Sequence, residues 1–464
     1  MFLTIRDRRE LFVDGEMIEE TDTNEILHHP VRRELIMNNQ ADGWVYYTVI
    51  NDHGLFRMYY LSMPMYSRDY SQHNPPYHHI CYAESTDGIH WVKPSLGLCE
   101  YEGSKDNNIL FITDTMDAFH VFMDPNAPAA ERYKSVFTKP GHQLWCATSS
   151  DGIRFTDGWM LTDKGHFDSH NTAFWDENRK QYVCYSRDFH PGSDGIGVRD
   201  IRRQVSDDFR HWSEPEMISY TESDYDFQMY TNGIQPYFRA PHIYLGFPAR
   251  YVERPEWTPN YDELCGAGHR KWRMQYHKRF GLAVTDGLFM SSRDGISFRR
   301  WNEAFVRPGP ESAKRWAYGD CYLAYGMLLT DVPGEDSQLS FYADCNNWSD
   351  TPTQVYRYSL RTDGFVSRSA GYAGASLITK PFSFIGDSLK INFETSAAGS
   401  VRVQILDGEG HSLEGFDSGE LFGDSISRNV RFSGRLAELA GRPVRMKMEL
   451  RDADVYAFRF ETTV

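Results

Sequence analysis

The sequence predicts an all-β protein in which a five-bladed β-propeller is followed by a C-terminal β-sandwich. Three observations carry this prediction. One turn motif recurs four times, short strand-like stretches separated by turn residues surround every copy, and strictly alternating strands replace this pattern after residue 365. Repetition of one small unit is typical of a ring of similar sheets.

The repeated turn reads Ser-x-Asp-Gly-x-x-aromatic, with Phe209 in place of the glycine in the third copy. We expect the aspartate to accept hydrogen bonds from backbone amides ahead of it and the glycine to adopt a positive φ. The aromatic residues that end the copies are 64, 57 and 86 residues apart, being Trp91, Phe155, Trp212 and Phe298. This spacing predicts one four-stranded unit per copy, with insertions in some units.

Alternating and β-branched stretches predict the strands of five units within residues 1–365, with residues 1–35 as a wrap-around segment. The clearest strands are 44–50, 56–61 and 80–84 in the first unit, 118–122, 133–137 and 144–148 in the second, 171–175 and 181–185 in the third, 230–237, 242–247 and 288–291 in the fourth, and 321–325, 339–343 and 354–360 in the fifth. The fourth unit carries a long polar insertion at about residues 249–285.

Residues 366–464 predict the smaller β-sandwich. Four stretches there alternate strictly between apolar and polar residues: 389–393, 400–405, 444–450 and 456–460. No group of catalytic residue types occurs in this part. We therefore expect a structural role for it, with carbohydrate binding as the alternative.

Composition narrows the possible partners. The formal charge of −16 argues against a nucleic-acid partner, and the aromatic content of 15% suits a surface that binds sugar rings. The chain has no apolar run of the ~20 residues that a membrane helix needs, and its first residues lack a secretion signal. The seven scattered cysteines are typical of reduced thiols. We expect a cytoplasmic enzyme with no cofactor; a structural Ca²⁺ is not indicated, and the oligomeric state stays open.

The order of strands in a propeller unit predicts where chemistry occurs. The repeated turns join third to fourth strands, so their aspartates lie on the face opposite the one where the innermost strands begin. We interpret them as scaffold. The acids at the starts of innermost strands are Asp42, Asp117, Asp168, Asp226 and Asp320. Several carboxylates around one axis suit glycoside hydrolysis, which needs one acid protonated and another ionised.

Polar and cationic residues near these strand starts are candidates for substrate binding. They are His120, Asn171, Arg187, Asp188, Arg199, Tyr230, Asn232, Gln235 and Arg250, and the loop after the second strand of the first unit adds Arg68, Asp69 and His73. Arginines there can orient hydroxyl groups or hold a carboxylate or sulfate on the substrate. The alternative is that they pair with aspartates and brace the loops.

Five stretches make the chain similar to a known group. They are Leu11-Phe-Val-Asp14, Cys81-Tyr-Ala-Glu-Ser85, Gly197-Val-Arg-Asp-Ile-Arg-Arg203, Tyr230-Thr-Asn232 with Phe238-Arg-Ala-Pro-His-Ile-Tyr244, and Ser369-Ala-Gly-Tyr-Ala-Gly374. On them the chain resembles the five-bladed propeller glycoside hydrolases of families 32, 43 and 117, above all uncharacterised bacterial proteins called family-32-like. The resemblance covers nearly the whole length and implies the propeller, the sandwich and a glycosidase activity.

The resemblance also implies roles for the acids. The stretch Phe167–Asp176 is similar to the region around the Arg-Asp-Pro motif of β-fructosidases, which favours Asp168 as the carboxylate that stabilises the transition state. Asp42 is then the nucleophile or base, and Asp226 or Asp320 the acid. No carboxylate stands at the Glu-Cys position of that group, near Tyr230, so a linkage other than a fructosidic one is expected.

The leading hypothesis is therefore a glycoside hydrolase that acts from the end of a short oligosaccharide. Two alternatives remain open at this point. One is a non-catalytic propeller that binds carbohydrate, and the other is a sialidase-like enzyme that acts on an acidic sugar with a tyrosine nucleophile and three arginines.

Overall fold

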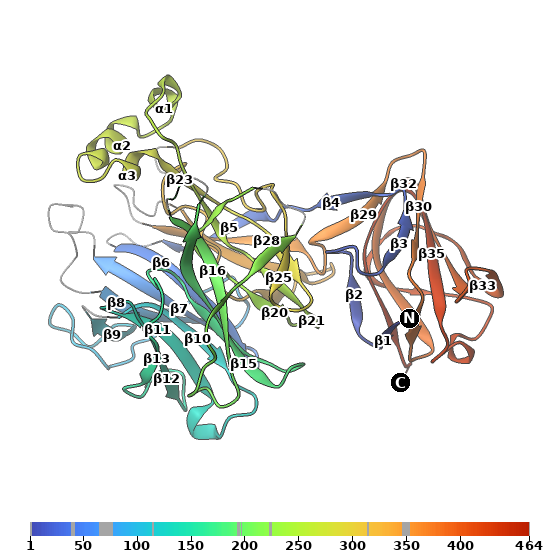
Figure 1. The fold of residues 1–464 in the computed structure, drawn as a ribbon, viewed down its shortest axis with the longest axis horizontal. Coiled ribbons are helices and arrows are strands. Elements are labelled where there is room, and N and C mark those ends of the chain that lie inside the picture. Colours follow the sequence, from blue (N-terminus) through green and yellow to red (C-terminus); the bar gives the residue numbers. More distant parts are fainter. Residues whose placement is uncertain are drawn as a thin grey trace.

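The fold is all-β, with several small sheets forming one lobe and one large sheet forming the other (Figure 1). The computed structural model describes residues 2–38, 42–64, 78–113, 116–192, 195, 197–221, 225–312, 315–345 and 353–463. Most strands predicted for residues 44–360 are present within a few residues of their expected positions.

Three antiparallel sheets of four strands follow one another along the chain. The first contains β6 (Asp42–Asp52), β7 (Leu55–Pro64), β8 (His78–Ser85) and β9 (Ile109–Thr113). The second contains β10 (Asp117–Met123), β11 (Tyr133–Lys139), β12 (Gln143–Ser149) and β13 (Trp159–Thr162). The third contains β14 (Thr172–Asp176), β15 (Gln181–Pro191), β16 (Gly197–Ser206) and β17 (Glu216–Met217).

The fourth sheet is interrupted by an insertion that the sequence did not predict as helical. It contains β18 (Ser219–Thr221), β20 (Gln235–Tyr237), β21 (Ala240–Gly246), β24 (Met290–Ser292) and β25 (Ser297–Arg300). A three-stranded sheet is formed by β19 (Gln228–Met229), β22 (Ala249–Glu253) and β23 (Ala283–Gly287). Between β22 and β23 lie α1 (Pro259–Glu263), α2 (Ala267–Met274) and α3 (Arg279–Leu282), which project from the lobe of small sheets (Figure 1).

The fifth sheet is completed by a strand from the start of the chain. It contains β26 (Leu328–Thr330), β27 (Gln338–Cys345), β28 (Gln354–Arg361) and β5 (Val31–Asn38), with β5 antiparallel to β28. The expected strand at 321–325 instead forms isolated bridges, one of them between Tyr325 and Thr48 of the first sheet. The fifth and first sheets are therefore neighbours.

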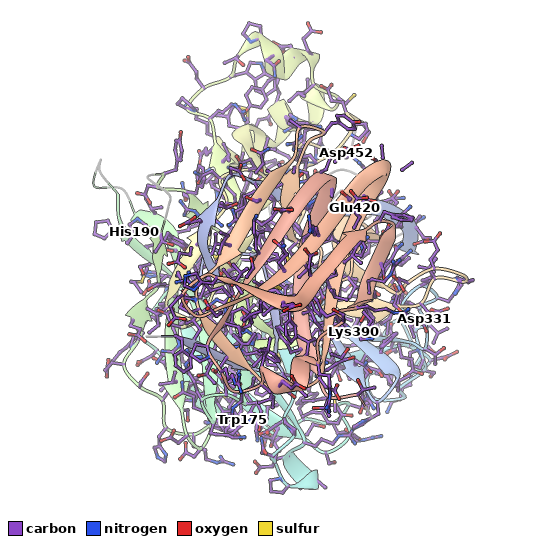
Figure 2. All side chains as sticks on the ribbon, turned by 90° about the vertical axis from the view of Figure 1, so that its right-hand side faces the viewer. Trp175, His190, Asp331, Lys390, Glu420 and Asp452 are labelled. Atoms are coloured by element: carbon purple, nitrogen blue, oxygen red, sulfur yellow. The ribbon has the colours of Figure 1, made fainter. Side chains whose placement is uncertain are left out.

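The C-terminal strands and the first four strands of the chain form one hydrogen-bonded sheet of 11 strands. Its members are β1 (Leu3–Arg6), β2 (Arg9–Leu11), β3 (Ile18–Thr21), β4 (Asn24–Leu27), β29 (Val366–Ala370), β30 (Ala375–Thr379), β31 (Phe382–Phe384), β32 (Ser388–Asp407), β33 (Ser412–Leu421), β34 (Asp424–Val430) and β35 (Val444–Glu461). Its strands lie side by side in front in Figure 2, which labels Lys390, Glu420 and Asp452.

This large sheet differs in two ways from the expectation. The four predicted strands are joined in pairs, because β32 and β35 continue through irregular register near residues 395–400 and pair over nearly their whole length. The N-terminal segment pairs here rather than only wrapping around the small sheets. The large sheet has a separate apolar core, which includes Phe393, Val401 and Met446. The division into a sandwich remains a prediction.

The repeated turns have the predicted geometry. In the first copy, Asp87 Oδ1 accepts hydrogen bonds from the amides of Ile89 and His90, both at 2.8 Å. Gly88 has a φ of 74°, and Phe209 adopts a φ of 64° in the copy that lacks glycine. Strand register also separates these turns from the strand starts: Ser85 pairs with Phe56, whereas Asp42 pairs with Pro64 at the other end of β7. The repeated aspartates are thus far from the predicted site.

A tyrosine from a neighbouring sheet binds the glycine of three turns. Tyr59 of the first sheet donates to the Gly152 carbonyl of the second at 2.9 Å, and Tyr185 of the third donates to Gly295 of the fourth at 2.6 Å. Tyr342 of the fifth sheet donates to Gly88 of the first at 2.7 Å. A Cβ atom at any of these glycines would lie 2.8–2.9 Å from the tyrosine hydroxyl, so no larger residue fits.

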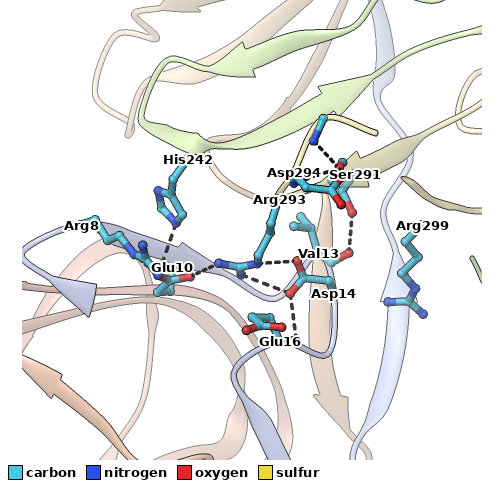
Figure 3. A network of polar contacts seen from close by, with 12 residues as sticks. Arg8, Glu10, Val13, Asp14, Glu16, His242, Ser291, Arg293, Asp294 and Arg299 are labelled. Atoms are coloured by element: carbon cyan, nitrogen blue, oxygen red, sulfur yellow. Dashed lines mark hydrogen bonds and ion pairs between the residues drawn. The ribbon is translucent and has the colours of Figure 1, made fainter. Parts of the chain in front are cut away.

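Buried ion pairs join the two lobes (Figure 3). Glu10 of β2 is fully buried and receives Arg293 Nη1 at 2.9 Å, and Arg293 Nε also binds Asp14 at 2.8 Å. Burial by itself raises the pKa of Glu10, but the hydrogen bond from His242 and the charge of Arg293 lower it to about 2. Arg293 belongs to the fourth repeated turn, so this turn holds the N-terminal strand in place.

Replacing Arg293 with methionine is expected to destabilise the protein by about 3 kcal/mol or more, because the buried Glu10 carboxylate would lose its main cationic partner. The midpoint of thermal unfolding at pH 7 measures this loss. Arg154→Met is the matched control, since Arg154 occupies an exposed position in the second repeated turn. Equal melting temperatures for the two variants would contradict the role of the Arg293 network.

Candidate functional site

Two carboxylates from neighbouring parts of the chain interact where innermost strands begin. Asp117 is the first residue of β10 and is only partly exposed, while Asp168 precedes β14 and has a side chain that is 72% exposed. Burial, and to a lesser extent the charge of the nearby Asp168 carboxylate, raises the pKa of Asp117 to about 7. One acid therefore holds a proton near neutral pH while its neighbour faces solvent, which is the pairing that acid–base catalysis requires.

The segment that carries Asp168 is fixed by buried hydrogen bonds. The Asn171 side chain donates to the carbonyls of Phe167 and Ser169, both at 2.9 Å, and its Oδ1 accepts the Arg187 amide at 3.0 Å. Ser169 donates to the Tyr230 carbonyl. Asp168 thus projects from a turn whose other side chains are buried.

Four tyrosines lie beside the carboxylates, and we call Tyr46, Tyr230, Tyr318 and Tyr322 the tyrosine cluster. The Tyr318 hydroxyl donates to the Tyr230 hydroxyl at 2.6 Å, and the rings of Tyr230 and Tyr322 stack at 5.5 Å. Burial raises the pKa of Tyr46 and Tyr230, and the Asp168 charge adds to both shifts. Asp117 also acts on Tyr46. The tyrosine cluster and both carboxylates therefore lie in one region of the fold.

Strained backbone occurs at the same strand starts. Tyr46 of β6 and Ala118 of β10 are non-glycine residues with φ values of 57° and 48°. Strand register shifts between Val45 and Thr48 in β6, and again between Asp117 and His120 in β10. Irregularities of this kind re-aim side chains and are concentrated near functional sites. They mark the beginnings of β6 and β10 as the region where the fold departs from regular pairing.

Two buried histidines support the site from beneath. His120 Nδ1 and His170 Nε2 lie 3.1 and 3.2 Å from the Thr48 hydroxyl, and His120 Nε2 lies 2.8 Å from the Ala173 carbonyl. Burial lowers the pKa of His120 to about 4, so its ring is neutral near pH 7. Both nitrogens of the predicted substrate ligand His120 are engaged within the fold, and its side chain is fully buried.

Arginines approach the tyrosine cluster from three elements. Arg187 of β15 lies 3.9 Å from the Asp168 carboxylate and 5.9 Å from the centre of the Tyr230 ring. Arg199 of β16 lies 5.6 Å from the Tyr230 ring and 4.6 Å from that of Tyr251. Arg279 of α3 lies 5.8 Å from the Tyr318 ring. The sequence indicated Arg187 and Arg199, but it gave no signal for Arg279 within the polar insertion.

Two acids predicted at the site lie in other surroundings. Asp320 is 1% exposed, and its carboxylate accepts the amide of Ala317 in its own turn at 3.2 Å. Asp226 binds His190 Nε2 at 2.9 Å, and His190 Nδ1 binds Asp200 at 2.8 Å.

Several predicted binding residues are engaged in the fold. Arg250 forms two hydrogen bonds to Asp286, at 2.6 and 2.9 Å, and Asp188 binds His166 and Arg202. The Asn232 side chain joins Thr172 to backbone carbonyls of the third sheet. These contacts favour the loop-bracing interpretation for them.

The roles expected for Gln235 and Asp42 stay predictions. Gln235 is buried, and its amide nitrogen has no hydrogen-bond partner among the described residues. Asp42 is the first residue of β6, but its side chain lies outside the described residues, as do Arg68, Asp69 and His73.

A groove of about 710 Å³ lies elsewhere, between β28 and the large sheet. Arg361 in this groove forms ion pairs with Asp424 and Glu394, and the Tyr456 hydroxyl donates to Glu394. The groove contains none of the residues predicted for the site. The acid–tyrosine region is the stronger candidate, because it holds the carboxylate of Asp117 with its raised pKa beside a second, exposed carboxylate.

In the described parts of the chain, no group of three or more His, Cys, Asp or Glu side chains is arranged to hold a metal ion. No helix among the described residues is both long and apolar enough to cross a membrane.

Comparisons with known proteins give distant structural likenesses. No protein-family model and no curated protein sequence matches the chain. A catalytic domain of Coprinopsis cinerea family-62 α-L-arabinofuranosidase is similar at a TM-score of 0.44 and 10% identity, over 72% of this chain and 99% of that one. A thermostable family-43 glycoside hydrolase has a TM-score of 0.41 and 13% identity, over 71% and 95%.

An N-acetylgalactosamine deacetylase from F. plautii, in complex with blood group B trisaccharide, is similar at a TM-score of 0.37 and 11% identity, over 91% of this chain and 95% of that one. The similar structures thus include glycoside hydrolases and an enzyme of another reaction class. At these scores the likenesses carry no argument for activity, which is inferred below from the chain's own residues.

Replacing Asn171 with alanine is expected to loosen the Asp168 segment, because two backbone carbonyls and the Arg187 amide would lose their partner. Each buried group left unpaired costs about 1–3 kcal/mol. Urea unfolding measures the lost stability. Asn178→Ala, in the turn between β14 and β15, is a comparison at an exposed asparagine. Unchanged stability of Asn171→Ala would show that its hydrogen bonds do not hold the segment.

Proposed function

We propose that the chain is a glycoside hydrolase in which Asp117 is the general acid and Asp168 is the carboxylate that faces the reacting sugar. The observation that carries this proposal is the coupling of the two acids in opposite environments. Asp117 is partly buried with a pKa raised to about 7, while Asp168 is exposed and has Arg187 3.9 Å away. Glycosidic bond cleavage uses such a pair across an oxocarbenium-like transition state.

In this mechanism, the protonated Asp117 donates its proton to the oxygen of the departing sugar. Positive charge then develops at the anomeric carbon, and the Asp168 carboxylate stabilises it. Asp117 replaces Asp226 and Asp320 as the acid, because its raised pKa is coupled to the Asp168 carboxylate. Asp42 remains our candidate for nucleophile or base, because β6 begins there, four residues before Tyr46.

A tyrosine nucleophile, as in the sialidase-like alternative, is less well supported. The Tyr230 and Tyr318 hydroxyls share a hydrogen bond, and burial raises the pKa of each above its ordinary value. The phenolate form that attacks carbon is therefore disfavoured at neutral pH. A mechanism that uses the carboxylate pair does not require a tyrosine to lose its proton.

We further propose that the first to fifth sheets are the blades of a five-bladed propeller within residues 1–365. The hydrogen bond from Tyr342 to Gly88 and the bridge between Thr48 and Tyr325 support closure of the ring between the last and first sheets. The substrate is a short oligosaccharide attacked from its end, and residues 366–464 form the sandwich-like companion.

Asp168→Asn is expected to lower kcat by about a thousandfold or more, because the amide keeps the shape of the side chain and removes the charge. Hydrolysis of a panel of aryl glycosides and natural oligosaccharides, with product analysis for release from the chain end, measures the effect. The melting temperature should be unchanged, since Asp168 is exposed. Near-normal turnover in this variant would exclude Asp168, and binding without turnover by the unaltered protein would favour a carbohydrate-binding module.

The pH profile tests Asp117. As its folded pKa is about 7, we expect kcat/KM to fall about tenfold per pH unit above 7, and Asp117→Asn should abolish this limb together with most activity.

The same shift also makes the stability of the fold depend on pH. The ordinary pKa of this carboxyl is 3.8, so the folded protein holds a proton that the unfolded chain releases between about pH 4 and 7. Stability therefore falls as the pH rises through this range. Asp117→Asn should be more stable than the unaltered protein at pH 8 and no more stable at pH 4. Equal melting curves at pH 8 would contradict the raised pKa.

A further inference from the structure

Two arginines at the tyrosine cluster lack an acidic partner. Among the described residues, Arg199 donates to the neutral side chain of Gln228. Arg279 lies against the rings of Phe280 and Tyr318 and is hydrogen-bonded to the neutral side chain of Tyr251. Among the described residues, neither forms an ion pair with a carboxylate, and the Nε atoms of both are buried without a hydrogen-bond partner. Unpaired donors in such surroundings are costly, and a bound group can satisfy them.

Other arginines of this lobe show that the absence of a partner is not general. Arg239 binds Asp363 through Nε at 2.9 Å, and Arg250, close in sequence to the same insertion, binds Asp286 through two nitrogens. Arg187 has the Asp168 carboxylate 3.9 Å away. The charge of Asp168 is thus opposed by Arg187, while Arg199 and Arg279 remain as excess positive charge in a chain of net charge −16.

Both guanidinium groups lie beside the tyrosine cluster, which also interacts with Asp168. Arg199 contacts Tyr230 and Tyr251, Arg279 contacts Tyr318, and the Tyr230 and Tyr318 hydroxyls are 2.6 Å apart. Stacking on aromatic faces holds each guanidinium plane, and each group keeps N–H donors besides the one that binds Gln228 or Tyr251. Guanidinium N–H donors match the two oxygens of a carboxylate or sulfate.

We propose that Arg199 and Arg279 bind a negatively charged group of the substrate, a carboxylate or a sulfate ester on the sugar beside the cleaved bond. This inference rests on the proposed hydrolase function and specifies its substrate class. Because Arg279 begins α3, the helical insertion between β22 and β23 is the element that confers this preference. The bound anion would supply the missing partner for both arginines.

The first experiment compares matched nitrophenyl glycosides that differ only in charge. Each pair consists of a glucoside and a glucuronide, a galactoside and a galacturonide, or a neutral sugar and its sulfate ester, in both anomeric forms. We expect the charged member of the productive pair to have kcat/KM about 10- to 100-fold higher, the effect of one charge-assisted hydrogen bond or more. The carboxylate and sulfate arms identify which anion is bound. This preference should decrease at high ionic strength.

The second experiment measures binding without turnover. Thermal shift and calorimetry with glucuronate, galacturonate, glucose 6-sulfate, glucose and galactose are performed on the Asp168→Asn protein and on the same protein with Arg199→Gln or Arg279→Gln added. We expect one or more charged sugars to stabilise the first protein and each arginine substitution to weaken that binding about 10- to 100-fold. Arg154→Gln, at the exposed second turn, is the matched control and should leave binding unchanged.

The outcomes separate the two proposals. Cleavage of neutral glycosides with no gain from charge would overturn the anion inference and leave the hydrolase standing. Arginine-dependent binding of a charged sugar, with no glycoside cleaved, would support the anion inference and reject the hydrolase. Absence of charged-sugar binding in calorimetry, or binding that persists in both arginine variants, would also overturn the anion inference.

Discussion

The fold depends on a contact between a tyrosine hydroxyl and the backbone of a turn. Tyr59, Tyr185 and Tyr342 each reach from one sheet to the glycine carbonyl of a turn in another, where no side chain larger than hydrogen fits. The contact fixes the angle between neighbouring sheets at one end of their strands. The opposite strand ends, where Asp117 and Tyr46 lie, are thereby set in position without needing regular geometry themselves. That freedom is visible in the positive φ values of Tyr46 and of Ala118, which follows Asp117.

The third repeat shows why the pattern has one exception. Phe209 stands where the other turns have glycine, and Lys134 of the second sheet lies 5.1 Å from its ring. The buried Phe209 ring packs against the Tyr182 ring, with 5.1 Å between their centres, at the place where the other turns bind a tyrosine hydroxyl. Packing of an aromatic ring can therefore replace a hydrogen bond at the same place, at the cost of a positive φ in a residue other than glycine.

Local patterns predicted the strands of the small sheets, because alternation and turn residues act within a few positions. Pairing across long separations was less accessible. Nothing near residues 3–27 indicates that they pair with strands after residue 366, and the polarity of residues 249–285 indicated an insertion but not its helices. At the candidate site, the sequence predicted Asp168 and Arg187, because each lies at or near the start of a predicted innermost strand.

The sequence could not separate Asp117, our proposed acid, from the other strand-start acids, because its raised pKa depends on burial and on Asp168, 51 positions away. Asp320 occupies a similar position in the pattern but is enclosed. The register shift after Asp117 also leaves no signature in composition.

The N-terminal segment has a consequence for synthesis. β2 pairs with β35, β4 with β29 and β5 with β28, so the earliest residues of the chain find their partners among residues 354–461. During translation these strands are synthesised long before their partners, so their edges stay unpaired and exposed to other molecules in the meantime. Their charged residues, such as Arg9, Glu10 and Glu25, keep them hydrated until Arg293 and Arg299 are made. The acidic residues that form ion pairs in the folded protein therefore also keep these strands hydrated before their arginine partners are synthesised.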